Sequence, residues 1–464
     1  MFTLDPEMMK KAFFTGEENA RFTHKTAGCF KLFPFVGNNS APIVSSCDLV
    51  VGEWLRLACA QKIELESMEE TLRKLADSID DLDDEGKEKL TQIARSVYWN
   101  DDETPSLKAE SIKAMRYLPC ENQAVMKTAL YLYSALNDGE KIKDAVKRAL
   151  ENAANDDNVL EKAVFEAMEA KIETLIPNAD YYVVHLAPRK IFMKDLQFIL
   201  ESPARTKEHL VDLLEFYYFF YTSQTSLMLS RFEDGDRDTI IPLYFSLDWE
   251  RTNKERECYR SGWEKLFPAI EKQLSHAATL EMLNQNPTGE KYDYVALKKY
   301  LEETGRYEEV AAQIKDLVDR YRNAIKDCEV MQELKKNENL DPVFSKVHFL
   351  FDNVLTQFRC SVRHRVNDAY TNHFKTFCQE RFLKFRGPCG FMLNITEERL
   401  VFLTKLVVNN QEKLSLKEVF HELELRGVFL DQPSKDEVVL FYSKLNLIEK
   451  KSDSGDAQYV RKIL

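Results

Sequence analysis

The chain has 464 residues, of which 77 are acidic and 64 basic, so its formal net charge is −13. This length predicts two or three domains, and a 44% hydrophobic content is enough to bury several cores. A negative average field excludes a protein that coats DNA over its whole surface, because phosphate contact needs clustered Lys and Arg. Any contact with nucleic acid must therefore be local.

The cysteines indicate a cytoplasmic protein. The nine of them are never closer than eleven residues apart, so they predict neither a zinc site nor a disulfide framework. Residues 1–14 include acids and lack an apolar core for export. The aromatic run 216–229 is interrupted by five polar residues and is shorter than the roughly 20 residues of a membrane span. We therefore expect no export, no membrane contact, no metal and no cofactor, and a buried helix over 216–229.

The N-terminal part is expected to be a domain over 1–130, a mixed segment followed by acidic helices. Residues 29–45 offer a short apolar strand, a Gly-Asn-Asn turn and a proline. Between Glu64 and Glu88 there are eleven carboxylates against three basic side chains, a local net charge of 3 − 11 = −8. A solvated helix face is the usual meaning of such a run, and a docking surface for a partner protein is the alternative.

The central part, 131–386, is expected to be a helical domain. Helical periodicity extends over 140–176 and 196–229. The loop 233–238 places Asp at alternate positions, as a calcium loop does, but Thr239 and Phe245 stand where such a loop needs Gly and Glu. A polar turn is the favoured interpretation, and an ion site is the alternative.

Two consecutive apolar seams predict a coiled-coil-like helical hairpin over about 304–385. The first seam has residues spaced alternately three and four apart: Tyr307, Val310, Ile314, Leu317, Tyr321, Ala324, Cys328 and Met331. The second, on a helix expected from Pro342 to about Phe385, comprises Val347, Phe351, Val354, Phe358, Val362, Val366 and Tyr370. Pairing within the chain is the simplest outcome. The alternative is that Tyr307, Val310, Ile314, Leu317 and Tyr321 bind a partner protein.

The end of the second seam is basic. Between residues 359 and 386 seven basic residues face two acidic ones, a net charge of 7 − 2 = +5. The basic residues are Arg359, Arg363, Arg365, Lys375, Arg381, Lys384 and Arg386. Arg359 and Arg363 lie four residues apart, on one helix face, where they suit phosphate contact. Pairing with the protein's own carboxylates is the alternative.

The last domain, 387–464, is expected to be a winged helix. Asn394 or Thr396 is placed to cap a first helix, and Ser415 with Glu418 and Ser434 with Glu437 match capping boxes for two more. The third helix is expected to turn Val438, Phe441 and Leu445 inward and to end at Asn446. Two short strands around an Asp-Ser-Gly-Asp turn follow. Helix, helix, a brief extended segment at 428–430, helix and hairpin is the winged-helix order, so the whole chain is predicted to be a mainly α, multi-helix bundle with a C-terminal α+β domain.

Charge argues against base reading by this domain. Its third helix would enter the major groove in a DNA-bound winged helix, yet residues 391–464 contain 11 basic and 12 acidic side chains. The wing is the better candidate for nucleic-acid contact, with Lys450, Lys451, Arg461 and Lys462. Protein docking is equally compatible with the composition.

No catalytic motif is present in the sequence: it contains no P-loop, no G-x-G-x-x-G, no H-E-x-x-H and no G-x-S-x-G pattern. Glu169-Ala-Lys171 is one acid–lysine arrangement found in many nucleases, but it lies within a charged helical pattern. We therefore assign no catalytic residue and expect a protein that is not an enzyme.

Three distinctive strings carry a resemblance to a known family. They are KLNLIEKKSDSGDAQYVRKIL at 444–464, PLYFSLDWERTNKERECYRSGW at 242–263 and RGPCGFMLNIT at 386–396. Together they resemble the DptG family, also called DndG, of bacterial DNA phosphorothioation-dependent restriction systems. The resemblance implies an accessory, non-catalytic subunit that works with a DptF-like NTPase and a DptH-like helicase or nuclease on unmodified double-stranded DNA. It supplies no catalytic residues.

Two classes of function therefore follow from the sequence. The first is an adaptor that bridges the NTPase and nuclease subunits and contacts DNA through the basic residues named above. The second is a scaffold that docks proteins through its winged helix and coiled coil, without touching DNA. An acidic average with one acidic and one basic segment is compatible with both.

Overall fold

The computed structural model is mainly helical, with several small sheets. It describes residues 1–15, 21–37, 47–106, 112–118, 122–137, 139–154, 159–201, 206–337, 339–450 and 458–463. The chain forms two compact units. Unit 1 combines residues 1–43, 180–187 and 219–464, and unit 2 combines residues 44–179 and 188–218. These interleaved units differ from the expected boundaries at 130 and 386, because the N-terminal segment packs with distant helices.

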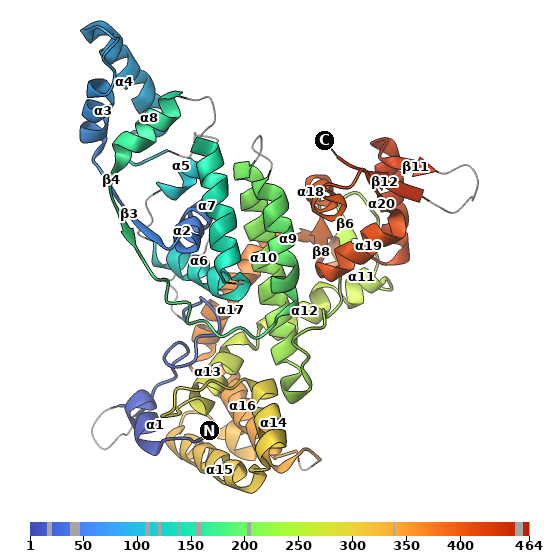
Figure 1. Ribbon diagram of the computed structural model, residues 1–464. Coiled ribbons are helices and arrows are strands. Elements are labelled where there is room, and N and C mark those ends of the chain that lie inside the picture. The colour runs from blue at the N-terminus through green and yellow to red at the C-terminus, as the bar shows by residue number, and fades with distance from the viewer. Residues whose placement is uncertain are drawn as a thin grey trace. The chain divides into compact units, whose positions relative to one another are not determined.

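Unit 2 consists of helices with one two-stranded sheet (Figure 1). Its elements are α2 (Cys47–Ala58), β3 (Gln61–Leu65), α3 (Met68–Asp77), α4 (Asp84–Tyr98), α5 (Ile112–Arg116), α6 (Gln123–Leu136), α7 (Glu140–Ala154), α8 (Val159–Met168), β4 (Glu169–Thr174), nearly all of α9 (Ala187–Leu200) and the first half of α10 (Thr206–Leu229). The acidic segment forms α3 and α4 as expected. Helix α3 turns Met68, Thr71 and Leu75 inward and its carboxylates outward.

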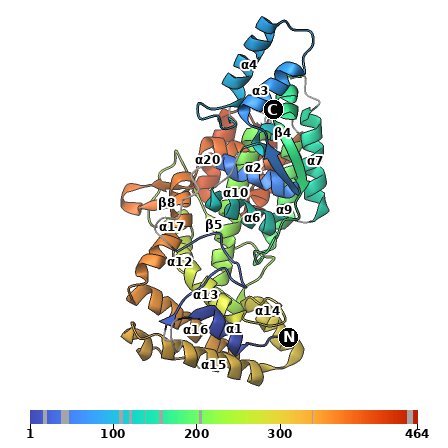
Figure 2. The same cartoon turned by 90° about the vertical axis from the view of Figure 1, so that its left-hand side faces the viewer.

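Strand β4 corrects the expectation of a helix through residue 176. It pairs antiparallel with β3, with Ile63 opposite Ile172, and Figure 2 shows the two strands side by side. The sequence Lys-Ile-Glu at 171–173 alternates polar and apolar residues as a strand does, but it is also compatible with a helix. Pairing with β3 decides in favour of the strand. Lys62 and Glu173, which are cross-strand partners, approach to 3.9 Å.

Unit 1 begins with α1 (Pro6–Phe13) and a short antiparallel pair, β1 (Phe14–Thr15) and β2 (Arg21–Phe22). The expected strand near residue 31 reduces to a single bridge from Lys31 to Tyr181, and the predicted turn at 37–39 lies largely outside the described residues. Glu281, which is buried, holds this segment. It accepts hydrogen bonds from the backbone N–H groups of Cys29 at 2.9 Å and Phe30 at 2.8 Å.

The buried helix expected over 216–229 is confirmed. It is the second half of α10, in which every residue from Phe216 to Leu229 is buried. Two of its polar residues are paired: Gln224 donates to the Ile241 carbonyl at 2.9 Å and accepts from the Ile241 N–H at 2.8 Å, and the Ser226 hydroxyl donates to the Thr222 carbonyl at 2.7 Å. A helix apolar on all sides is stable only inside a core, and such pairing is what allows polar residues to be buried there.

The central helices of unit 1 follow α10. They are α11 (Glu257–Arg260), α12 (Trp263–Ile270), α13 (Gln273–Leu283), α14 (Tyr294–Thr304), α15 (Tyr307–Ala324), α16 (Pro342–Cys360) and α17 (His364–Arg381). The predicted hairpin exists, because α15 packs along α16, and Figure 1 shows these two helices together with α1 and α14.

Both hairpin helices are shorter than expected. Helix α15 stops at Ala324, where Ile325 is extended, and a 3-10 turn (Glu329–Glu333) follows. The second helix is broken at Ser361, whose hydroxyl returns to the Gln357 carbonyl at 2.6 Å. Val362 is consequently 79% exposed instead of lying in the seam. A local side-chain hydrogen bond here competes with the helix.

The loop 233–238 is a polar turn. A 3-10 turn (Phe232–Asp234) opens it, and Asp236 accepts from the Asp238 N–H at 2.9 Å and from the Thr239 hydroxyl at 2.5 Å. Asp236 is thus engaged in the local turn. Among the residues that the structure describes, no group of His, Cys, Asp and Glu side chains is arranged to hold a metal ion.

Short strands connect the central helices to the C-terminal part of unit 1. Strand β5 (Leu243–Tyr244) pairs in parallel with β10 (Val428–Phe429), and β6 (Ser246–Leu247) pairs in parallel with β8 (Phe391–Ile395). Strand β7 (Leu383–Phe385) runs antiparallel to β8. This β7–β8 hairpin was not expected from the sequence.

The C-terminal elements are α18 (Glu397–Val408), β9 (Lys413–Ser415), α19 (Leu416–Leu425), β10, α20 (Gln432–Lys444), β11 (Ile448–Lys450) and β12 (Gln458–Arg461). The last strands form an antiparallel sheet in the order β11-β12-β9. We call residues 397–463 the C-terminal module. The two strands of the expected hairpin are present, and its turn at 451–457 lies outside the described residues.

Candidate functional site

Local sequence signals position the helices of the C-terminal module. Thr396, rather than Asn394, caps α18, and the Ser415–Glu418 capping box opens α19. Gly427, with a φ of 75°, provides the left-handed turn that ends α19, and a Cβ there would meet the Phe220 ring at 2.6 Å. Glycine is the residue that accepts both constraints.

The predicted capping box at Ser434 is wrong. Helix α20 begins at Gln432, and Asp431 caps it by accepting from the Ser434 N–H at 3.2 Å. The Ser434 hydroxyl instead donates to Glu250, at 2.9 Å and 3.0 Å from its two oxygens. The Ser434 hydroxyl, which the sequence pattern predicted to cap the helix, therefore makes a tertiary hydrogen bond instead.

A buried charge network fixes α20 to the loop after β6. The Arg256 guanidinium contacts both oxygens of Asp431, at 2.8 Å and 2.5 Å, and Glu250 at 3.2 Å. Burial acts to raise the pKa of Asp431, but hydrogen bonds from Arg256 and Ser434 outweigh it and lower that pKa to about 2. The side chains of Glu250 and Asp431 are only 2% and 9% exposed.

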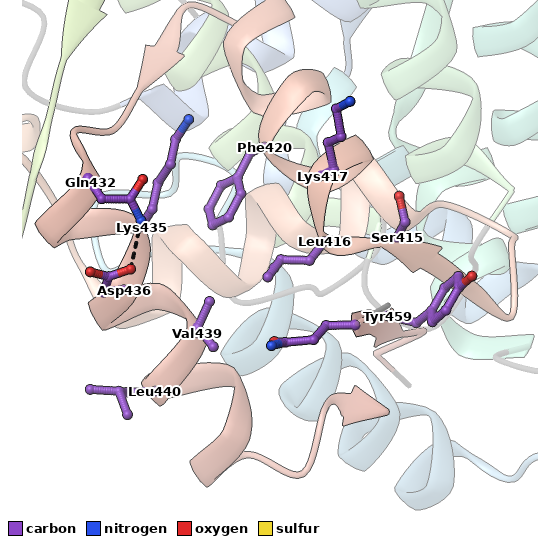
Figure 3. A pocket seen from close by; sticks show the side chains of 11 residues that line it. Ser415, Leu416, Lys417, Phe420, Gln432, Lys435, Asp436, Val439, Leu440 and Tyr459 are labelled. Carbon is purple, nitrogen blue, oxygen red and sulfur yellow. Dashed lines mark hydrogen bonds between the residues drawn. The ribbon is translucent and has the colours of Figure 1, made fainter. Parts of the chain in front are cut away.

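A surface groove lies between α19, α20 and β12 (Figure 3). Its volume is about 690 Å³, and we call it the C-terminal groove. Its lining is Ser415, Leu416, Lys417, Phe420, Gln432, Lys435, Asp436, Val439, Leu440, Gln458 and Tyr459. Leu416, Phe420 and Val439 face one another across the groove, Leu440 lies apart from them at its edge, and Lys417 and Lys435 lie on either side of Phe420.

The groove was missed in the sequence analysis. Of the three residues expected to face inward, Val438 and Phe441 are buried, but Leu445 is 45% exposed. Val439 and Leu440 lie on the outward side, where Leu440 is 55% exposed. Four consecutive apolar residues, Val438 to Phe441, exceed what one buried helix face accommodates, and that excess was the available signal.

The basic residues of the predicted stretch 359–386 fall into two groups, according to whether their side chains are bound within the protein. Lys384 pairs with Asp248 at 2.7 Å, and Arg386 donates to the Glu250 carbonyl at 3.0 Å and to the Asn394 side chain at 2.9 Å. These two cations hold the β7–β8 hairpin to the loop after β6. Lys375 lies 5.4 Å from the centre of the Phe267 ring.

The remaining basic residues lie around the break between α16 and α17 and at the end of α17. Arg363 donates to the Phe22 carbonyl at 3.2 Å, and Arg381 is exposed where α17 ends. Arg359 and Arg365 are exposed on either side of the α16–α17 break. Neither has an ion pair or hydrogen bond within the described part of the chain. We call the exposed residues 359, 360, 362, 364 and 365 the basic joint.

The cations predicted for the wing are less available for contact with nucleic acid than Arg359 and Arg365. Arg461 contacts Glu449 at 3.2 Å, and Lys462 contacts the Asn410 side chain at 3.4 Å. Glu449 also accepts from Lys413 at 2.7 Å. Lys451 and the side chain of Lys450 lie outside the described residues.

The partner-binding prediction for the first seam is corrected. Val310, Ile314, Leu317 and Tyr321 are at most 1% exposed, because α16 covers them, and Tyr307 is half-buried at the start of α15. The seam pairs within the chain, which was the simplest expectation, so these residues do not form a free docking face.

Comparison of the sequence with protein-family models and with curated proteins finds no match. Within the described residues, no helix combines the length and the apolar character needed to cross a membrane.

Proposed function

We propose that this protein is a non-catalytic adaptor that contacts DNA at the basic joint and carries a winged-helix module. The winged-helix assignment is supported by the order helix, strand, helix, short strand, helix, strand, strand in the C-terminal module. It is also supported by the sheet order β11-β12-β9. In this sheet β9, the first strand of the module along the chain, pairs with β12, the second strand of the wing hairpin.

The basic joint is the observation that supports DNA contact. Arg359 and Arg365 are exposed cations without partners among the described residues, beside the exposed His364. Phosphate contact requires accessible Lys and Arg side chains. Lys384 and Arg386 are committed to the β7–β8 hairpin, so the proposed DNA contact is narrower than the basic stretch of the sequence.

The wider role that we propose is that of an accessory subunit in a DNA phosphorothioation-dependent restriction complex, where the chain bridges an NTPase and a nuclease subunit. This part of the proposal rests on the three sequence strings that resemble the DptG family. The alternative is a protein scaffold without DNA contact. The apolar C-terminal groove and the neutral charge of the module favour that alternative.

Reversing Arg359 and Arg365 together to Glu is expected to weaken DNA binding. Fluorescence anisotropy with a duplex of about 20 base pairs, across a salt series, should give a slope of log affinity against log salt that is shallower by about 2 than in the wild type. The double variant Lys127→Glu with Lys141→Glu, at two exposed positions of unit 2, is the control of equal charge change.

The outcomes of this titration separate the two functions. Equal weakening by both double variants would mean a non-specific charge effect and would remove the basic joint from the proposal. No binding to the duplex by the wild type at low salt would leave the scaffold alternative.

A further inference from the structure

Two cysteines of unit 1 lie at the C-terminal end of α16. Cys360 is the last residue of this helix and is exposed. Cys328 immediately precedes the 3-10 turn that follows α15, and it is 4% exposed. Among the cysteines that the structure describes, Cys360 is the exposed one. Its thiol is therefore the sulfur that a small solute reaches most easily.

Polar contacts fix the segment between α15 and the 3-10 turn against α16. The Asp327 carboxylate accepts a hydrogen bond from the Gln357 side chain at 2.7 Å. Arg322 donates to the Met331 carbonyl at 2.9 Å and to the Asn353 side chain at 2.7 Å. These contacts hold the segment along the last turns of α16.

The Cys328 thiol lies beside the helical turn that precedes Cys360. Its Sγ is 3.9 Å from the carbonyl oxygen of Thr356. Thr356 and Cys360 are four residues apart in α16, and a helical side chain points back over the turn before it. The helix therefore directs the Cys360 side chain toward the region that the Cys328 thiol occupies.

The two thiols differ in how readily they react. Burial raises the pKa of Cys328, and the neighbouring Cys360 and Asp327 add to this rise. A thiol that stays protonated is a poor nucleophile toward an oxidant in solution. The exposed Cys360 is therefore the sulfur that meets an oxidant, and Cys328 is placed to react with the product.

We propose that Cys360 and Cys328 form a redox modification site, at which a peroxide produces an intramolecular disulfide. The Cys360 thiolate attacks one peroxide oxygen, the O–O bond breaks, and the departing hydroxide takes up the thiol proton to become water. Cys328 then attacks the sulfenic sulfur and displaces its hydroxyl group, which leaves as a second water with the Cys328 proton. The two thiols lose two electrons in total, and the peroxide gains them. A dithiol reductant reverses the reaction.

The disulfide would join the end of α16 to the segment after α15, beside Arg359 of the basic joint. Reversible disulfides of this kind are redox-sensing and are distinct from the disulfide frameworks that stabilise small secreted domains. In the cross-linked protein, the amides of the last turn of α16 should exchange with solvent more slowly than in the reduced protein. Equal exchange rates would contradict this tethering. The inference does not depend on DNA binding.

Peptide mapping of the full chain by mass spectrometry, without reductant, tests the pair. After treatment with hydrogen peroxide, the wild type should yield a cross-linked peptide pair that contains Cys328 and Cys360, and dithiothreitol should remove it. Cys360→Ser should abolish the cross-link. Cys29→Ser, at a partly exposed cysteine outside the pair, is the matched control and should give the same cross-link as the wild type.

Cys328→Ser separates the two steps of the reaction. Without the second thiol, oxidation of Cys360 should stop at the sulfenic acid, so dimedone should label this variant more strongly than the wild type. Circular dichroism checks that the variant is folded. The proposal is overturned if peroxide oxidises Cys360 of the wild type without linking it to Cys328, if it links cysteines only between chains, or if it leaves Cys360 reduced. Equal dimedone labelling of the wild type and the variant would also overturn it.

Discussion

Replacing Arg256 with alanine should lower the free energy of unfolding of unit 1 by about 3–5 kcal/mol, because removing one partner of a buried ion pair leaves the other charged and unpaired. Two carboxylates would be left, on Glu250 and Asp431, and both are nearly inaccessible to water. The Asp431 side chain also caps α20, so the loss should spread to that helix.

Urea unfolding and hydrogen exchange would measure this effect at two levels. Urea reports the global loss, and faster exchange of the α20 amides locates it in the C-terminal module. Arg256→Lys keeps the charge without the planar fork that contacts both Asp431 oxygens, and should fall between the alanine variant and the wild type. Arg251→Ala, at an exposed position of the same loop, should change stability by less than about 0.5 kcal/mol. Equal losses at positions 251 and 256 would contradict a special role for this network.

The stability of unit 1 should fall steeply as the pH drops below 6.5. Burial lowers the pKa of His24 to about 3, with a further contribution from Arg363, and burial lowers the pKa of His185 to about 4. Burial likewise lowers the pKa of His276 well below 6.5. The unfolded chain takes up these protons near pH 6.5 and the folded chain does not. The stabilisation is thus complete above pH 6.5 and is lost as the pH falls toward the folded values.

The expected slope of the free energy of unfolding against pH follows from the number of histidines with a lowered pKa. Each histidine removes about 1.4 kcal/mol per pH unit below 6.5, so the three together remove about 4 kcal/mol per unit. His276 is the best one to vary: its Nδ1 lies 3.0 Å from the Tyr294 hydroxyl, and its ring stacks on Phe351 at 4.3 Å between centroids. Electrostatic interactions with Lys272 and His348 add to the effect of burial in lowering the pKa of His276.

Urea unfolding at pH 7 and pH 5 would test this dependence. His276→Gln should reduce the slope by about one third, because one of the three protons is no longer taken up. His421→Gln, at an exposed position of α19, is the matched control for the removal of one imidazole. A stability that is level from pH 7 to pH 5 would contradict the prediction.

The candidate site was only partly predictable. The cations of the stretch 359–386 could be read from the sequence, but their availability could not. Lys384 and Arg386 look the same as Arg359 in a sequence, and the carboxylate and carbonyl groups they bind lie more than a hundred residues earlier in the chain. The C-terminal groove arises in the same way, from α19, α20 and β12 brought together.

The local features of this protein could be predicted from its sequence. The Ser415–Glu418 capping box, the turn at Gly427, the buried helix at 216–229 and the two seams follow from side chains a few residues apart, whose interactions form wherever the chain goes. The tertiary structure set the rest: strand β4 where a helix also fits, the cap of α20 at Asp431 and the cations left free. Those outcomes depend on partners distant in sequence, and hydrogen bonds to such partners outweigh the small differences in local preference.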